Sequence, residues 1–141
     1  MTPAELQVAG WAAREIEAFT GELGTIWTRG VGVTREVGFF VSTRHVNTHL
    51  HTCHGGALMT FADTALGFGV VDALDAENCT TAQLQLHFVA AAKVGDFVTC
   101  RPEIVRRGGQ LVFVRGLLCV GDKTVASADG MWKVLELRAK A

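Results

Sequence analysis

Asp63 is the only charged residue in a long apolar stretch, GGALMTFADTALGFGVV, which runs from residue 55 to 71. Removing water from a carboxylate is costly unless the group is paired or has a chemical purpose. A carboxylate in this setting is suited to act as a general base on water or as a nucleophile. Asp63 alone is equally consistent with a structural carboxylate that caps a turn or pairs with an arginine, so its neighbours must decide.

Two glycines, Gly55 and Gly56, open this stretch directly after His54. At a helix N-terminus, glycines leave backbone N–H groups unshielded, and the helix dipole favours negative charge there. Such an N–H group can hold a carbonyl oxygen as it becomes an oxyanion. Along one helix, Asp63 would lie about 12 Å from Gly55, too far to act on the same carbon. We therefore expect Gly55 of one chain to meet Asp63 of a second.

A metal site is the main alternative chemistry in this region. Five good transition-metal ligands precede the apolar stretch within ten residues: His45, His49, His51, Cys53 and His54. No second group of ligands follows downstream, so we expect no metal. A serine hydrolase is disfavoured because neither of the two serines, Ser42 and Ser127, lies in a GxSxG motif.

The elements that position these residues can be read from hydrophobic spacing. Residues 55–74 predict one long helix, apolar almost all round and enclosed by other elements. Residues 3–20 predict an amphipathic helix, with a capping box at Thr2–Glu5. Strands are predicted within 25–47 and then as a meander over 82–88, 97–105, 111–120 and 124–137. A sheet covers only one side of an enclosed helix, which also favours a homodimer.

The segment from Asn47 to Asp63 resembles the hot-dog-fold acyl-CoA thioesterases, in the PaaI-like branch of the 4-hydroxybenzoyl-CoA thioesterase superfamily. The likeness rests on His-Gly-Gly at 54–56 and on Ala-Asp-Thr at 62–64, nine residues after the histidine. It continues from Thr81 into the Ala-Lys-Val-Gly-Asp turn and covers roughly residues 37–134. The resemblance implies an α+β hot-dog fold, an antiparallel sheet wrapped around one long central helix, with an extra N-terminal helix.

The resemblance also implies roles for single residues. Asp63 would activate water or attack the thioester, and Gly55 would hold the carbonyl oxygen. Thr81 would hold the water or the carboxylate. Asn47 and His54 would polarise the carbonyl or fix the loop. Asn47 stands seven residues before His54 where the family pattern has six, so that His49 is an alternative for its part. A hot-dog hydratase is disfavoured because Phe68 stands where a helical partner of the carboxylate would be needed.

Bulk composition sets limits on the partners. The 141 residues carry a formal net charge of −1 with scattered charges, which is untypical of nucleic-acid binding or of a polybasic membrane anchor. Arg106 and Arg107 precede Gly108 and would either contact the phosphates of coenzyme A or lie in a solvated hairpin turn. The four cysteines form no CxxC pair, which indicates reduced thiols and a cytoplasmic protein.

Together these observations predict a single hot-dog domain over residues 1–141 that hydrolyses an aryl- or fatty-acyl-CoA thioester without cofactor or metal. We expect a homodimer with shared active sites, arranged as a dimer of dimers, hence a homotetramer. No nucleic-acid or membrane partner is expected. The main alternative outside catalysis is an acyl-CoA-binding dimer without activity.

Overall fold

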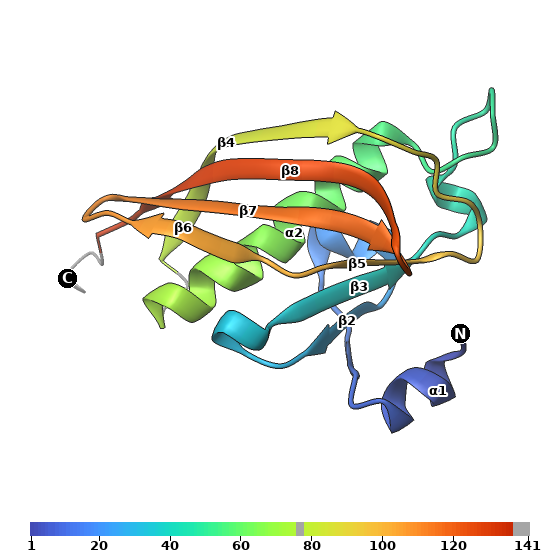
Figure 1. Cartoon of the computed structure of the whole chain (residues 1–141), viewed down its shortest axis with the longest axis horizontal. Helices are drawn as coiled ribbons and strands as arrows, with labels where there is room; N and C mark the ends of the chain where they lie inside the picture. Colours follow the sequence, from blue (N-terminus) through green and yellow to red (C-terminus); the bar gives the residue numbers. More distant parts are fainter. Residues whose placement is uncertain (76–77, 137–141) are drawn as a thin grey trace.

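The structure, a computed structural model, describes residues 1–75 and 78–136. One long helix lies behind an antiparallel sheet that curves around it (Figure 1). Two α-helices and three short 3₁₀ helices are present in the described residues: α1 Pro3–Val8, α2 Gly55–Leu74, η1 Ala18–Leu23, η2 Gly32–Thr34 and η3 Thr43–His45. The eight strands are β1 Ala12–Arg14, β2 Ile26–Arg29, β3 Glu36–Phe40, β4 Cys79–Phe88, β5 Phe97–Cys100, β6 Glu103–Arg107, β7 Leu111–Val120 and β8 Lys123–Val134.

The predicted fold class, a sheet wrapped around one long helix, is confirmed. Helix α2 has the bounds expected from the sequence. His54 caps its N-terminus, because the ring Nδ1 accepts a hydrogen bond from the N–H of Gly56. Asp75 ends it in the left-handed conformation. By length and composition α2 is apolar enough to cross a membrane, but in this fold it forms one wall of the core.

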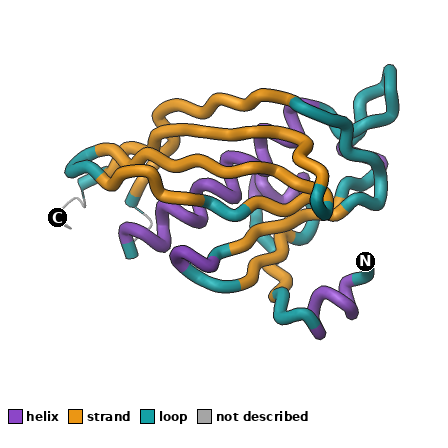
Figure 2. The backbone as a smooth tube through the Cα atoms, in the orientation of Figure 1, coloured by secondary structure: helices purple, strands orange, loops and turns teal. Residues whose placement is uncertain are grey.

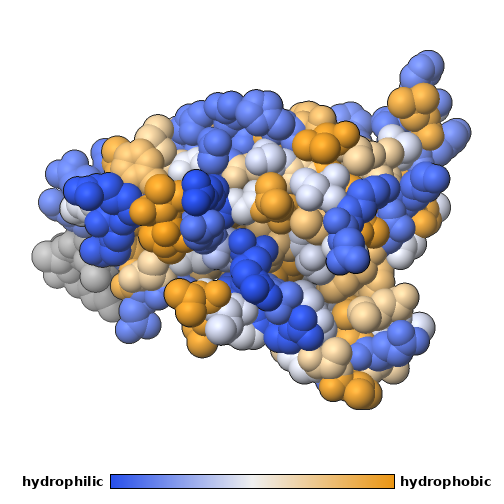
Figure 3. Space-filling model, in the orientation of Figure 1, coloured by the Kyte–Doolittle hydropathy of each residue, from blue (hydrophilic) through white to orange (hydrophobic). Residues whose placement is uncertain are grey.

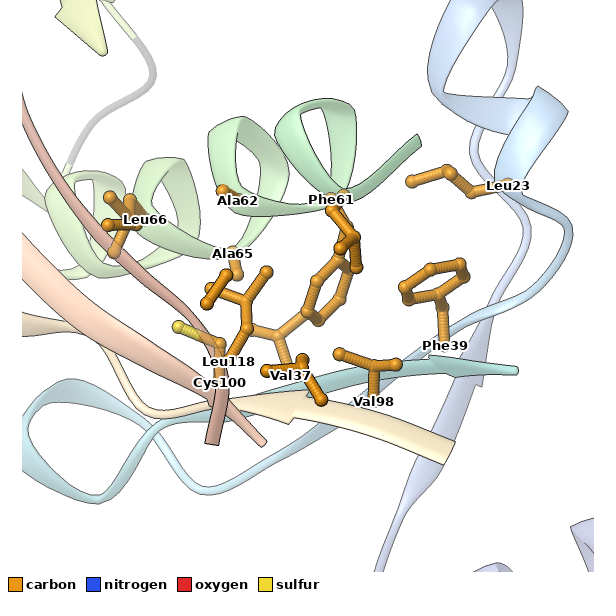
Figure 4. Packing of buried hydrophobic residues seen from close by; sticks show 14 of the residues in the cluster. Leu23, Val37, Phe39, Phe61, Ala62, Ala65, Leu66, Val98, Cys100 and Leu118 are labelled. Atoms are coloured by element: carbon orange, nitrogen blue, oxygen red, sulfur yellow. The ribbon is translucent and has the colours of Figure 1, made fainter. Parts of the chain in front are cut away.

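The core lies between α2 and the inner face of the sheet. Phe61 packs on Phe39 of β3 with ring centroids 4.6 Å apart, and Leu66 and Leu118 are fully buried in the same cluster (Figure 4). Gly69 brings α2 close to the sheet, since a Cβ at this position would lie 2.5 Å from Cβ of Pro102. Alanine in place of Gly69 would therefore push the helix away from the strands.

The order of strands differs from the predicted meander. The sheet runs β1-β2-β3-β5-β7-β8-β4, and β6 pairs with β7 beyond the end of β5. The expected strand over 97–105 is therefore two strands, because Pro102 interrupts the ladder between them. Strand β4, first after the helix, lies at the far edge beside β8 (Figures 1 and 2). Residue 137, the expected end of the last strand, lies outside the described residues.

The N-terminal helix is much shorter than the predicted 3–20. It ends at Val8, and Gly10 then turns the chain with a φ of +93°. Trp11 is buried with Leu6 and Trp27, and the following residues add strand β1 to the edge of β2. Burial of an indole ring outweighs the helix propensity of an alanine-rich segment. The amphipathic helix over residues 3–20 would also have buried Phe19, which is 72% exposed in the structure.

The outer face of the sheet carries ion pairs rather than a second core. Figure 3 shows hydrophilic side chains spread over this face among scattered apolar ones. Arg115 of β7 bonds Glu103 of β6 at 3.2 Å, and both side chains are exposed. Exposed pairs of this kind contribute little to stability. Their exposure indicates that this face of the sheet is in contact with solvent in the single chain.

Candidate active site

Asp63 projects from the middle of α2 toward the edge strand β4. Its Oδ1 accepts a hydrogen bond of 2.6 Å from the hydroxyl of Thr81. The carboxylate is half-buried, and the threonine is exposed. The sequence-based pairing of these two residues is thus realised within one chain. A hydroxyl donating to a carboxylate fixes the carboxylate's orientation and leaves its other oxygen free for a proton from water.

A β-bulge in β4 is what aims Thr81 at the helix. Thr81 pairs with Trp132 of β8, and the register then shifts so that Gln83 pairs with Met131. Side chains alternate along a regular strand, so without the extra residue Thr81 would face away from Leu84, which packs on the core. Bulges commonly re-aim a side chain next to a functional site.

Gly55 is the first residue of α2 and keeps its N–H available. Among the described residues, no acceptor bonds this N–H, whereas the N–H of Gly56 donates to Nδ1 of His54 at 2.8 Å. The expectation that both glycines offer free N–H groups is therefore wrong for Gly56. Gly55 therefore supplies the one free N–H donor of this glycine pair, at the positive end of a 20-residue helix.

His54 and Asn47 hold the loop before the helix. His54 uses Nδ1 as an acceptor, so a neutral ring carries its proton on Nε2, on the exposed side. The Asn47 side chain closes the loop: Nδ2 donates to the Thr52 carbonyl at 3.1 Å and Oδ1 accepts from the N–H of Leu50 at 2.6 Å. Of the two roles expected for Asn47, the structure gives it the loop-fixing one. The tip of this loop protrudes beside the start of α2 (Figure 2).

The candidate metal ligands do not converge. His45 is buried with both ring nitrogens engaged, by the Ser42 N–H at 3.0 Å and the Glu22 carbonyl at 2.8 Å. His49 and His51 are exposed in the protruding loop. In residues 1–75 and 78–136, no three His, Cys, Asp or Glu side chains are close enough to share an ion. The geometry therefore does not support the His-cluster metal enzyme.

The cysteine beside the site is not poised as a nucleophile. Cys53 is buried, and burial raises the pKa of its thiol to about 11. Because the thiolate is the reactive form, Cys53 stays protonated and unreactive at neutral pH. Cys53 is therefore no rival to Asp63, in the middle of α2, for base or nucleophilic chemistry.

Arg106 and Arg107 lie far from Gly55 within one chain. They end β6, at the hairpin into β7, and are exposed. Figure 1 shows this hairpin at the opposite end of the molecule from the start of α2. A single chain does not bring these arginines and Gly55 together.

A second carboxylate of α2, missed by the sequence reading, serves the scaffold. Asp72 accepts two hydrogen bonds from Arg35, at 2.8 and 2.9 Å, and one from the N–H of Gly32 at 3.0 Å. Burial acts to raise the pKa of Asp72, but the hydrogen bonds from Arg35 and Gly32 and the charge of Arg35 hold it below its usual value. The pair ties η2 to the last turns of α2. The sequence shows that an arginine and an aspartate are present, but it does not show that Arg35 and Asp72 pair with each other.

The sequence matches the thioesterase superfamily over residues 50–127, a range that contains Gly55, Asp63 and Thr81. The chain therefore belongs to this superfamily, as predicted from the His-Gly-Gly motif and the spaced aspartate. A protein of Pseudomonas aeruginosa named "Putative esterase PA0474" is 32% identical over 93 residues, which are 65% of this chain and 69% of that protein.

Two solved structures share the fold. The E. coli PaaI protein from the phenylacetic acid degradation operon has a TM-score of 0.67 at 19% identity, covering 96% of this chain and 86% of that one. A hypothetical thioesterase protein from Streptococcus pneumoniae, solved with coenzyme A, has a TM-score of 0.69 at 21% identity, covering 79% of this chain and 87% of that one. Both likenesses confirm the hot-dog fold, and the first is to a PaaI protein.

Proposed function

We propose that this protein hydrolyses acyl-CoA thioesters, with Asp63 as the reacting carboxylate. The observation that carries the proposal is the Asp63–Thr81 hydrogen bond of 2.6 Å on a helix whose first N–H, at Gly55, has no acceptor among the described residues. Membership of the thioesterase superfamily and the coenzyme A in the S. pneumoniae structure support the substrate class. The acyl group that we propose is an aryl or a fatty one.

In the proposed reaction the thioester carbonyl oxygen binds the N–H of Gly55, where developing negative charge is stabilised. On the general-base route Asp63 takes a proton from water while the water oxygen bonds to the carbonyl carbon. The C–S bond then breaks, and coenzyme A leaves as the thiol with that proton. On the nucleophilic route the carboxylate oxygen of Asp63 bonds to the carbonyl carbon, the C–S bond breaks, and coenzyme A leaves as the thiolate. Water then hydrolyses the mixed anhydride, which releases the acyl group as the free acid, regenerates Asp63 and supplies the proton for the thiolate. Thr81 orients the carboxylate on either route, and His54 keeps the loop and the helix N-terminus in place.

The proposed active unit is a homodimer. Gly55 and Asp63 are eight residues apart (63 − 55) on one straight helix, about 12 Å, so neither can complete the site alone. A two-fold axis that places Gly55 of one chain on Asp63 of the other must pass near residue 59, the midpoint (55 + 63)/2, because isologous contacts are reciprocal. Met59 stands there and is 36% exposed.

The edge of β4 supports the same assembly. In the described part of the chain β4 pairs on one side only, with β8. Its ten residues, CTTAQLQLHF, include no Lys, Arg, Asp, Glu or Pro, although unpaired edge strands are normally protected by such residues. A second β4 would pair with this edge and continue the sheet. A dimer of dimers is the further assembly that we propose.

Within this dimer Arg106 and Arg107 are proposed to contact the phosphates of coenzyme A. Antiparallel α2 helices would bring the β6–β7 hairpin of one chain toward Gly55 of its partner. Replacing both arginines by alanine should raise KM for an acyl-CoA and leave KM for the matching acyl-N-acetylcysteamine thioester, which lacks phosphates, unchanged. Equal KM changes for both substrates would show that these arginines do not bind the phosphates of coenzyme A.

Thiol release from a panel of aryl- and fatty-acyl-CoAs tests the proposed function. Wild type should release coenzyme A, with and without prior chelator treatment, and Asp63→Asn should lose at least about 100-fold in kcat as removal of an essential base does. Binding of acyl-CoA without release by wild type would instead favour the non-catalytic acyl-CoA binder. Release abolished by chelator would contradict the metal-free reaction.

The proposed location is the cytoplasm. Cys53, Cys100 and Cys119 are free thiols in the structure, which is typical of a reducing compartment. Cell fractionation with antibody detection would test this, and recovery with the membrane or secreted fraction would contradict it.

A further inference from the structure

Phe88 is the last residue of β4, and its ring lies against Gly55. Ring atoms Cζ and Cε1 are 3.3 and 3.4 Å from the position that a Cβ on Gly55 would take. Phe88 is nevertheless 55% exposed. A large, partly exposed apolar ring thus lies on the Cβ side of Gly55, the residue whose backbone N–H has no acceptor among the described residues.

The position of Phe88 along β4 explains this exposure. After the bulge at Thr81, the side chains that face the helix are those of Leu84, Leu86 and Phe88. The two leucines pack against the core, whereas Phe88 belongs to neither buried cluster. Phe88 is the last residue of β4, and this end of β4 lies by the start of α2 (Figure 1). Packing of the single chain therefore does not account for a ring at this position.

We infer that Phe88 is a specificity-determining residue that limits branching at the acyl carbon next to the thioester carbonyl. The inference rests on the proposed function, which places the carbonyl oxygen about 2.9 Å from the nitrogen of Gly55. The carbon atoms bonded to that carbonyl then lie within reach of the ring that fills the space beside Gly55. An unbranched carbon passes along the ring, and a methyl branch collides with it.

One methyl group in a closely packed site changes kcat/KM by about 10- to 200-fold. Wild type should therefore prefer a straight-chain acyl-CoA over its 2-methyl counterpart by at least about tenfold. Phe88→Ala removes the ring and should reduce this preference to about twofold or less, because the space beside Gly55 opens. Phe88→Leu, which keeps bulk but is shorter, should fall between the two.

The experiment measures kcat/KM of wild type, Phe88→Ala and Phe88→Leu for butyryl-CoA, octanoyl-CoA and their 2-methyl derivatives. The ratio within each matched pair is the readout, so that a general loss of active enzyme or of dimer cancels. Val89→Ala is the matched control: Val89 is the next residue, 61% exposed, and follows the end of the strand. Its ratios should equal those of wild type.

Reduced discrimination in Phe88→Ala and Phe88→Leu, with unchanged ratios in Val89→Ala, would establish the inference. An unchanged ratio in active Phe88→Ala, or an equal change in Val89→Ala, would overturn it while leaving the proposed function intact. Absence of hydrolysis of any thioester by wild type would overturn the proposed function, and this inference with it. The outcomes therefore separate the two claims.

Discussion

The hydroxyl of Thr81 donates a 2.6 Å hydrogen bond to Oδ1 of Asp63, from an edge strand to the central helix. The register shift between Thr81 and Gln83 makes this contact possible, because it turns Thr81 to the same face as Leu84. One inserted residue in a strand thereby joins the strand to the helix at Asp63, the carboxylate that we propose as the reacting group. The contact also gives Thr81 a defined part, to orient a carboxylate.

Removal of the Thr81 hydroxyl should weaken catalysis. A hydrogen bond to a charged group contributes about 1.5–3 kcal/mol, so Thr81→Val should lower kcat by about 10- to 150-fold. Thr81→Ser keeps the hydroxyl and should retain activity within about threefold of wild type, since the donor is preserved. Steady-state kinetics of the two variants on one acyl-CoA provides the check, and equal losses would assign Thr81 a packing role instead.

The N–H of Gly55 can be removed without removing the helix. Proline is favoured at the first position of a helix, and His54 already has the φ of −62° and ψ of 138° that a residue before proline adopts. Gly55→Pro should therefore fold, and should lose about 100- to 1,000-fold in kcat, as other oxyanion donors do.

Gly55→Ala is the matched control for this variant. It adds a Cβ at the same place, against the ring of Phe88, but keeps the N–H. Its kcat should exceed that of Gly55→Pro by at least tenfold, a difference that measures the N–H alone. If both variants lost the same activity, crowding at Phe88 rather than a lost donor would be the cause.

The Arg35–Asp72 pair should make stability depend on pH. The pKa of Asp72 is lowered in the folded state, so its contribution is present above the unfolded pKa of about 3.9 and is lost as pH falls through the lower folded value. Both side chains are 9% exposed, and Arg35→Met should cost about 3–5 kcal/mol because it leaves a buried charge.

Urea unfolding at pH 7 and pH 3 checks this prediction. Wild type should lose stability between the two values, and Asp72→Asn should lose less because the titrating group is gone. Glu103→Gln, which breaks the exposed pair with Arg115, is the control and should behave as wild type at pH 7. If the free energy of unfolding fell by the same amount between pH 7 and pH 3 in wild type and in Asp72→Asn, Asp72 would not be the group responsible.

The two-fold axis near residue 59 can be tested by cross-linking. Met59→Cys places two thiols close to the axis of the proposed dimer, and mild oxidation should give a covalent dimer on a non-reducing gel. Val33→Cys, 93% exposed on η2, is the control and should remain monomeric on the gel. Cross-linking of both variants at the same rate would indicate random collision, not an interface at α2.

Local patterns in the sequence predicted the elements next to the site more successfully than their arrangement. The composition of residues 55–74 indicated a buried helix, because length and Ala, Leu and Met content are local properties. The N-terminal helix was predicted too long, since burial of Trp11 depends on partners elsewhere in the chain. The position of β4 beside β8 is likewise a non-local pairing that no alternating pattern specifies.

The candidate site divides in the same way. Asp63, Gly55 and His54 could be singled out because an isolated charge and paired glycines are visible in one short segment. The occupied N–H of Gly56 and the loop bonds of Asn47 were not predictable, because they depend on side-chain orientation. The Arg35–Asp72 pair joins residues 37 positions apart, and nothing local links them.

In the proposed dimer each active site takes Gly55 from one chain and Asp63 from the other. Mixed dimers of Gly55→Pro and Asp63→Asn, refolded together at equal amounts, test it most directly. Each variant alone should be inactive, but half of the mixed population would be heterodimers with one intact site. The account predicts recovery of about a quarter of wild-type activity on statistical assembly. No recovery, with heterodimers demonstrated by differential tagging, would contradict the shared site.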